Sequence, residues 1–338
     1  MSNNSNSNSN SNVDDNNNNN HVSASILTST LPDEPSHLSI DDLLSKEQLK
    51  LSFKDRSAIE EEIHGVRCLA QEETPELLER TLREFDSELM ARKEGYPKNE
   101  LLRNVVSISG SSISSAEAEA AKAECYLNDP DIRLRFLRCE CFVVTKAIQR
   151  FVSFLKHTSE LFGDFVAERP IRLSDFTKGT ELSALLNSRN QYLPFRDRSG
   201  RRVLVGVGTC DFDIDLVLRF KIIMFLHWVA SEDIETQRKG VVIIAWVSNE
   251  GDKDTMWEDA VRPQVSYRAR MFMQQTDAAM PLRVTSIHCY FKDTSFFRSL
   301  STLYVVGLDS HNRSIFKAHF GKLHNTIFCV HLSLFQMN

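Results

Sequence analysis

The spacing of hydrophobic residues in the second half of the chain alternates between two periods. Short apolar runs typical of strands occur at 191–195, 203–207, 241–247, 283–291 and 315–320. Segments with helical spacing separate the later runs, at about 213–231, 256–279 and 296–306. The unbroken run Val241–Val247 is typical of a strand that is covered on both faces. This order predicts an α/β fold with a mostly parallel sheet, right-handed crossovers and flanking helices.

The first half of the chain shows helical spacing instead. Residues 40–92 predict helices, and Thr74 and Pro75 fit the N-cap and the first position of one of them. The apolar residues of that helix share one face, which must dock on another surface: Leu77, Leu78, Leu82, Phe85 and Leu89. A second cap signal at Asp129, followed by a helix at about 145–162, predicts a small helical unit before the sheet.

Composition divides the chain into segments. Residues 2–20 are almost all Asn and Ser, and so they have too little apolar surface to fold. We expect a disordered tail at 1–39, acidic amphipathic helices at 40–92, a linker at 93–124, a helical unit at 125–165, the sheet domain at 166–321 and a divergent tail at 322–338. The Asp197–Gly200 stretch, with Asp first and Gly last, predicts the turn between the first two strands.

Charge and cysteine usage narrow the class of protein. The 338 residues carry a formal net charge of -6, which gives no general attraction to nucleic acid or to an anionic membrane. The seven cysteines are scattered, with no second Cys/His pair at zinc spacing, and so we expect reduced thiols. The start of the chain lacks the pattern of a signal peptide, and no window is apolar enough to span a bilayer. These features predict a cytoplasmic protein.

The familiar catalytic motifs are missing from the sequence. Gly206 and Gly208 follow a predicted strand, but Asp211 stands where the third glycine of a dinucleotide-binding turn belongs, and its charge would repel a pyrophosphate. There is no P-loop and no Gly-x-Ser-x-Gly elbow. His288 and Cys289 are adjacent in a predicted strand, so their side chains point to opposite faces of the sheet. We therefore expect no enzyme, no catalytic residue, no metal site and no cofactor.

Three stretches, in order along the chain, carry a resemblance to a known family. They are Arg133–Phe142 followed by Lys146-Ala147, then Glu235–Val247, and last Pro281–His288 with Phe296–Asp309 and Phe316–Gly321. Together they resemble the CRAL-TRIO family, which includes retinal and tocopherol carriers and phosphatidylinositol transfer proteins. The resemblance covers about 125–321. It implies a helical N-terminal unit and a sheet that forms the floor of a lipid pocket, closed by a mobile gate helix.

The resemblance implies a lipid-binding site as well. We expect a lipid on the sheet floor and under the gate helix, in contact with Ile243, Ala245, Ile287, Cys289, Phe291, Phe296, Phe297, Leu300 and Leu303. The basic residues around the turn predict contact with lipid headgroups, and ordinary solvated turn charges are the alternative: Arg196, Arg198, Arg201 and Arg202. The implied function is that of an intracellular lipid carrier or sensor that visits a membrane surface transiently and binds no nucleic acid.

The chain also departs from the family pattern. Val143 stands where the family often has a capping Asp, and Tyr304 falls near the position of a gate-helix Lys. The stretch Asp293–Ser295 replaces the usual Pro-Trp before the gate. These differences do not support the headgroup-binding Lys of phosphoinositide carriers.

Three other interpretations compete with a lipid carrier. The altered gate and tail also fit a protein-interaction module, with the acidic helices at 40–92 as the partner surface. The apolar stripes also fit a solid core, since most such stripes pack against protein. An enzyme rests only on the α/β class, which supports many chemistries and proves none.

Overall fold

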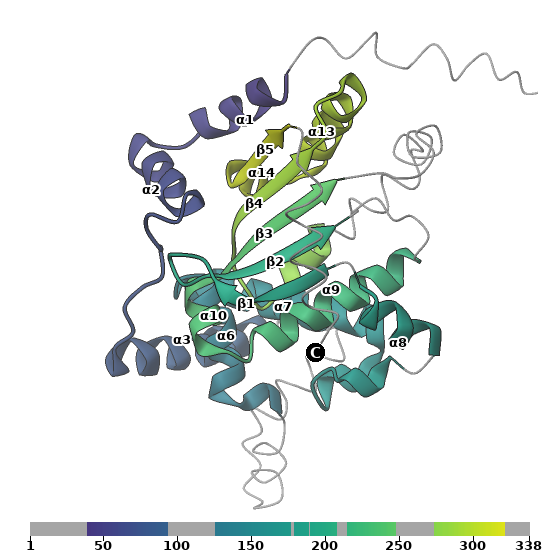
Figure 1. Cartoon of the computed structure of the whole chain (residues 1–338). Coiled ribbons are helices and arrows are strands. Elements are labelled where there is room, and N and C mark those ends of the chain that lie inside the picture. The colour runs from purple at the N-terminus through teal and green to yellow at the C-terminus, as the bar shows by residue number, and fades with distance from the viewer. Residues whose placement is uncertain are drawn as a thin grey trace, which may run out of the picture. The chain divides into compact units, whose positions relative to one another are not determined.

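The computed structural model describes six stretches of the chain (Figure 1): residues 39–93, 126–176, 179–188, 190–207, 215–247 and 274–321. The predicted tails, most of the predicted linker and the first part of the helix predicted at 256–279 lie outside the described residues. Gly208 and Asp211 lie outside them as well.

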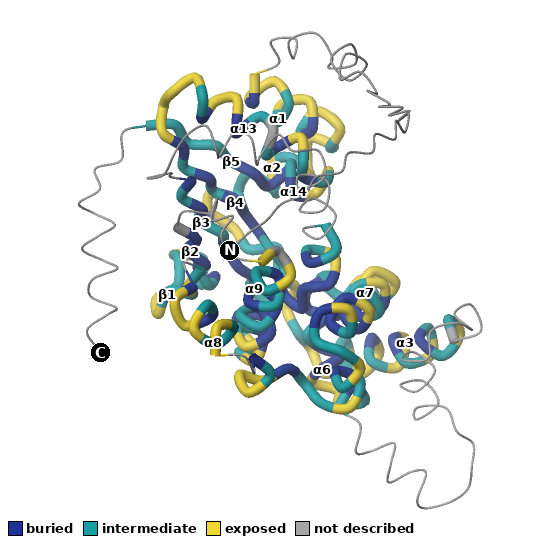
Figure 2. Tube along the Cα trace, turned by 90° about the vertical axis from the view of Figure 1, so that its right-hand side faces the viewer, coloured by how far each residue is buried: buried dark blue, intermediate teal, exposed yellow. Residues whose placement is uncertain are grey.

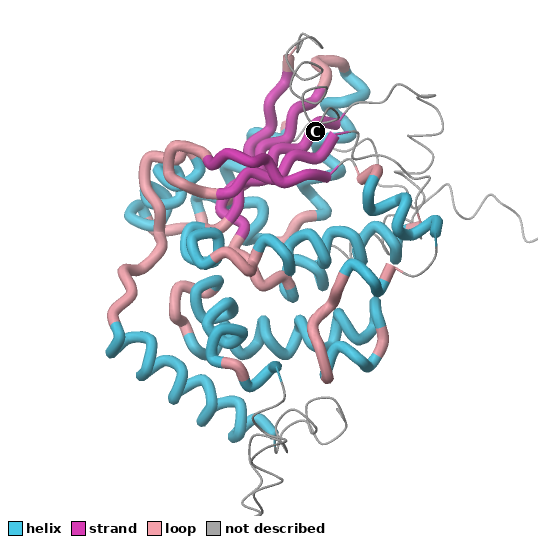
Figure 3. The backbone as a smooth tube through the Cα atoms, turned by 60° about the horizontal axis from the view of Figure 1, so that its bottom comes forward, coloured by secondary structure: helices cyan, strands magenta, loops and turns pink. Residues whose placement is uncertain are grey.

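The second half of the described chain contains a five-stranded sheet. Its strands lie in sequence order: β1 (Asn190–Arg196), β2 (Arg202–Val207), β3 (Val241–Val247), β4 (Val284–Phe291) and β5 (Phe316–Phe320). β1 and β2 are antiparallel, whereas the other neighbouring pairs are parallel. Figure 3 shows the strands as one sheet with helices along it. The prediction of an α/β fold with N-terminal helices and a mostly parallel sheet is confirmed.

The β1–β2 turn forms as its sequence predicts. The amide of Gly200 donates to the Asp197 carbonyl at 2.9 Å, and the Asp197 carboxylate accepts from the Ser199 amide at 3.0 Å and the Arg201 amide at 2.8 Å. Gly200 has a φ of 80°, which an L side chain rarely adopts. The acidic first residue and the final glycine therefore fix the hairpin.

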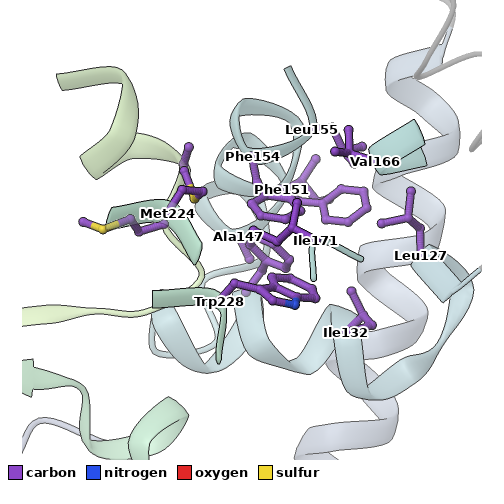
Figure 4. Close-up of a cluster of buried hydrophobic side chains, with 14 of the residues drawn as sticks. Leu127, Ile132, Ala147, Phe151, Phe154, Leu155, Val166, Ile171, Met224 and Trp228 are labelled. Atoms are coloured by element: carbon purple, nitrogen blue, oxygen red, sulfur yellow. The ribbon is translucent and has the colours of Figure 1, made fainter. Parts of the chain in front are cut away.

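The helices of the first half form a core of their own. They are α3 (Pro75–Lys93), α6 (Pro130–Cys139) and α7 (Val144–Phe162), and they pack with α9 (Leu216–Ala230) from the sheet domain. Figure 4 shows the centre of this core, where the rings of Phe154 and Trp228 stack with centroids 5.2 Å apart. The predicted apolar face of α3 docks here, because Phe85 is fully buried and meets Phe151 edge to face.

The ends of these helices follow the predicted cap signals. The Thr74 hydroxyl accepts from the Leu77 amide at 3.2 Å, and the Asp129 carboxylate accepts from the Asp131 amide at 2.9 Å. Val143 precedes α7 without a side-chain cap, so this helix lacks a bond that Asp would supply.

Other helices flank the sheet or lie beside the helical core. α1 (Ile40–Leu49) and α2 (Phe53–Ile63) lie within the predicted helical segment, and α13 (Ser295–Gly307) is the predicted gate helix. Residues 274–279 form the described end of the helix predicted at 256–279. Several short elements were not predicted from the sequence: α8 (Gly179–Leu186), α10 (Ile234–Lys239), α14 (Ser310–Ser314) and the 3-10 turns Tyr126–Asn128, Asp164–Ala167 and Leu173–Asp175. Within the described stretches, no helix combines the length and the apolar character that a bilayer crossing requires.

Candidate functional site

The predicted lipid-contacting residues gather on one face of the sheet. Ile243 lies opposite Ile287, and Ala245 lies opposite Cys289, in the parallel register of β3 and β4. Paired residues of neighbouring strands point to the same side, so these side chains share a face with Phe291. On that face they form one hydrophobic cluster with Phe296, Phe297 and Leu300 of α13. Thus the structure brings together all of the predicted residues except Leu303, whose side chain lies outside the description.

A row of small residues crosses the middle of this face. It runs through four neighbouring strands, as Gly206, Ala245, Cys289 and Ala318. The rows two residues to either side are bulky: Leu204, Ile243, Ile287 and Phe316 on one side, and Val247, Phe291 and Phe320 on the other. At about 3.3 Å per residue, the two bulky rows lie about 13 Å apart along the strands. We call this row of small side chains between two bulky rows the trough, and two of its members, Ala245 and Cys289, are 6% and 0% exposed.

α13 covers the part of this face formed by β4 and β5. The Thr294 hydroxyl caps α13 by accepting from the Phe297 amide at 3.4 Å, so a threonine begins this helix where the CRAL-TRIO pattern has Pro-Trp. The Tyr304 ring lies 5.8 Å from that of Phe316, centroid to centroid, and so it packs on the sheet near the position where a family Lys was expected. The guanidinium of Arg298 sits over the Phe320 ring, 4.6 Å from its centroid.

A polar network ties the far end of α13 to the helical unit. The Asn312 side chain, in α14 just after α13, donates to the Asp277 carboxylate at 2.8 Å and to that of Asp309 at 3.2 Å. Arg150 of α7 donates to the Asp277 carbonyl at 2.6 Å. Burial and the neighbouring Asp309 charge raise the pKa of Asp277 to about 7. This anchor was not predicted from the sequence, because no motif spacing connects residues 150, 277 and 312.

Different chemistry occupies the opposite face of the sheet. His288 Nδ1 lies 3.1 Å from His319 Nε2, and the His319 ring stacks on Tyr290 with centroids 4.5 Å apart. Burial lowers the pKa of His288 to about 4, and His319 adds to the effect. Cys289 lies on the other face of the sheet, so His288 and Cys289 do not form a pair although they are adjacent in the sequence. Helix α2 contacts β4, and its Glu60 pairs with Lys317 of β5 at 2.7 Å.

The four predicted headgroup-binding arginines all make internal contacts. Arg196 pairs with Asp233, and Arg202 donates to the Leu193 carbonyl at 3.3 Å. Arg198 is exposed, yet it donates to the His64 carbonyl at 2.8 Å. The remaining one, Arg201, is only 2% exposed and pairs with the Asp197 carboxylate at 2.7 Å.

These contacts give the arginines a structural role at the β1–β2 turn. Headgroup contact remains a prediction for the other three, whereas Arg201 faces inward in this conformation. The alternative of a solvated turn charge does not describe Arg201 either, because its guanidinium lies inside the molecule.

Three other features were considered as candidate sites: a cavity, clusters of metal-binding side chains and a buried cysteine. A cavity of about 240 Å³ lies between α7 and residues 274–279, away from the sheet face, and His157 and Gln274 are among its polar lining residues. In the described stretches, no cluster of three or more His, Cys, Asp or Glu side chains has the geometry to hold a metal ion. Cys139 is buried, and burial raises the pKa of its thiol to about 11, so its thiolate is scarce at neutral pH.

A buried histidine makes the stability of the fold depend on pH. His227 of α9 is 1% exposed, and burial lowers its pKa to about 4 from the ordinary histidine value of 6.5, although its Nδ1 lies 2.8 Å from the Ile223 carbonyl. The unfolded chain takes up a proton below pH 6.5, whereas the folded chain resists it. The contribution of neutral His227 is therefore present above pH 6.5 and is lost as the pH falls towards 4.

We expect the free energy of unfolding to fall by about 2 kcal/mol more in the parent than in His227→Gln between about pH 7 and about pH 5. Urea unfolding at the two pH values measures this difference. Equal pH slopes in the parent and the variant would contradict it, whatever the absolute stability of the variant.

Comparison with known proteins adds no relative to this picture. Neither a scan against profiles of protein families nor a search of curated proteins finds a match to the chain.

Proposed function

We propose that the chain binds a lipid or another apolar small molecule on the trough face of the sheet, under α13. The observation that carries the proposal is the row of small residues between two bulky apolar rows, in register over four strands. Small side chains in line lower the floor between the two bulky rows, and this supports a place where an acyl chain can lie across the strands. The CRAL-TRIO resemblance of residues 125–321 implied five members of these rows as lipid contacts: Ile243, Ala245, Ile287, Cys289 and Phe291.

The binding energy would come from the removal of apolar surface from water. Each buried methylene contributes about 0.8 kcal/mol, so ten of them supply on the order of 8 kcal/mol before the costs of ordering. Among the described residues, the rows of the trough consist of apolar side chains and glycine, and Arg298, over the Phe320 ring, brings a charge to one edge. Such a site selects its ligand by shape and by apolar length, as an intracellular carrier or sensor requires.

Release of the ligand would need α13 to move. Its far end is held by the Asn312–Asp277 bond, whereas its first turn is held by the Thr294 cap and by the apolar contacts of Phe296 and Phe297. We infer that α13 swings outward at its first turn, with α14 as the fixed end. Such a motion exposes apolar side chains, and it is therefore favourable only against a membrane or another apolar surface.

The alternative of a protein-interaction module finds less support in the arrangement of the acidic helices. Glu47 and Glu62 are buried, and they pair with Arg313 at 3.3 Å and Arg283 at 2.7 Å. These two charges therefore hold α1 and α2 to the sheet domain and do not form a surface for a partner.

Extraction of the purified full-length chain tests the proposal. We expect organic solvent to release an apolar compound in near-equimolar amount, identified by mass spectrometry. We also expect the chain to move a fluorescent lipid between two populations of vesicles. A chain that releases no such compound and transfers no lipid does not have this function.

A further inference from the structure

The corner between α1 and α2 exposes two large apolar side chains. Leu49, at the end of α1, is 68% exposed, and Phe53, at the start of α2, is 84% exposed. Phenylalanine is usually among the more buried residue types, so this degree of exposure is costly in water unless another apolar phase receives the ring.

Three lysines lie near these two residues in the sequence. Lys46, Lys50 and Lys54 are all exposed, and residues 46–56 contain four basic and two acidic side chains, although the whole chain has a net charge of -6. Of the two acids, Glu47 is buried and pairs with Lys50 at 3.0 Å and Arg313 at 3.3 Å. Within the part of the chain that the structure describes, no ion pair is found for Lys46 or Lys54.

Hydrogen bonds hold the corner in this shape. The Ser52 hydroxyl caps α2 by accepting from the Asp55 amide at 3.1 Å, and it donates to the Asp55 carboxylate at 2.6 Å. Arg56 reaches back to the Gln48 carbonyl at 3.2 Å, and the Gln48 side chain donates to Glu60 at 2.5 Å. The exposed side chains therefore stand on a preorganised support, which reduces the entropy lost when they bind.

We propose that the α1–α2 corner, defined as Lys46–Lys54, docks the protein on an anionic lipid bilayer. Leu49 and Phe53 enter the boundary between headgroups and acyl chains, while the three lysines contact the lipid phosphates. The complementary charge favours a lipid surface, and an apolar wedge combined with a basic cluster supplies the two signals that reversible membrane attachment requires.

The corner begins in α1, a helix that packs with α13. Ile40, Leu43 and Leu44 of α1 belong to the same hydrophobic cluster as Phe297 and Leu300 of α13. Figures 1 and 2 show α1 and α13 at the same end of the sheet, near β5. Docking would place α13 close to the bilayer that supplies or accepts the ligand. The inference deepens the proposed carrier function, but it rests on separate residues.

Sedimentation of the full-length chain with vesicles tests the proposal. We expect binding to phosphatidylcholine vesicles that contain about 30% phosphatidylserine, much weaker binding without the anionic lipid, and release by high salt. Replacing Lys46, Lys50 and Lys54 together with Gln should weaken binding about 100-fold, at about fivefold per lysine. The Leu49→Ser, Phe53→Ser double variant should weaken it at least about tenfold.

A matched control comes from another element. Leu186, at the end of α8, is 69% exposed, and Leu186→Ser should bind vesicles as the parent does. Unchanged circular dichroism of the surface variants confirms that they fold.

Three outcomes would overturn the proposal. The first is that the double variant binds vesicles like the parent, and the second is that the parent binds pure phosphatidylcholine vesicles equally tightly. The third is that the parent forms a dimer and binds no vesicles, while the double variant is monomeric. If the chain binds anionic vesicles but neither releases nor transfers a lipid, the membrane-docking proposal is supported and the carrier function is contradicted.

Discussion

Ala245→Leu is expected to empty the protein of its apolar ligand while leaving the ligand-free fold about as stable as before. Ala245 is 6% exposed and lies in the row of small residues, between Gly206 and Cys289. A leucine there adds three carbons to the floor of the trough and takes the place of the ligand. We expect at least about a tenfold loss of co-purified and transferred lipid, with a change in the free energy of unfolding of less than about 1 kcal/mol.

The same substitution in a filled core serves as the control. Ala147 of α7 is fully buried in the helical core of Figure 4. Ala147→Leu should cost about 1–3 kcal/mol because no space awaits the added carbons, and it should leave lipid content unchanged. Stabilities are compared on delipidated proteins, since a bound ligand stabilises the parent.

The opposite pattern would end the proposal. If Ala245→Leu destabilises the fold as much as Ala147→Leu does and lipid content does not change, the sheet face is a solid core. The prediction thus separates the two interpretations that the apolar pattern leaves open.

The elements of the sheet were readable from sequence because their periods are strong. The β3 run was predicted with its observed bounds, and alternation within 283–291 placed His288 and Cys289 on opposite faces, as observed. α10 and α14 were missed because six and five residues contain too few turns to show a helical period.

The trough itself could not be derived before the register was known. Its four residues are spread from Gly206 to Ala318, and a slip of one residue between any two strands would move one of them to the other face. The register between strands of a parallel sheet depends on how the sheet packs against helices, and the local sequence of a strand does not reveal this packing. The same limit applies to the Asp277–Asn312 bond, which joins two elements that are distant in sequence.

The turn arginines show a related limit. A charged residue beside a polar turn is usually solvated, and no local pattern distinguishes Arg198, which is exposed, from Arg201, which is buried. The difference arises because α2 ends over this turn. The guanidinium of Arg201 donates to the Glu62 carbonyl of α2 at 2.5 Å and to the Thr285 hydroxyl of β4 at 3.2 Å.

Arg201→Met is therefore expected to be among the most destabilising substitutions in the turn, at about 3 kcal/mol in the free energy of unfolding. The methionine fills much of the volume but removes the guanidinium bonds to Asp197 Oδ2, the Glu62 carbonyl and the Thr285 hydroxyl, while Asp197 Oδ1 keeps its two amide donors. The Asp197 side chain is 21% exposed, so water can solvate its carboxylate after the substitution. The expected loss in the free energy of unfolding is therefore at the lower end of the range for a broken buried ion pair.

Arg198→Met provides the comparison for this last prediction, because Arg198 lies in the same turn and also donates to carbonyl groups of the α2 end, but from an exposed position. Water replaces its bonds, and the expected loss is less than about 1 kcal/mol in urea unfolding. If the four arginines instead act mainly as headgroup ligands, both variants should lose vesicle binding alike and neither should lose stability. A gap of about 2 kcal/mol between the two variants, with vesicle binding unchanged, assigns Arg201 to the joint between α2, the turn and β4.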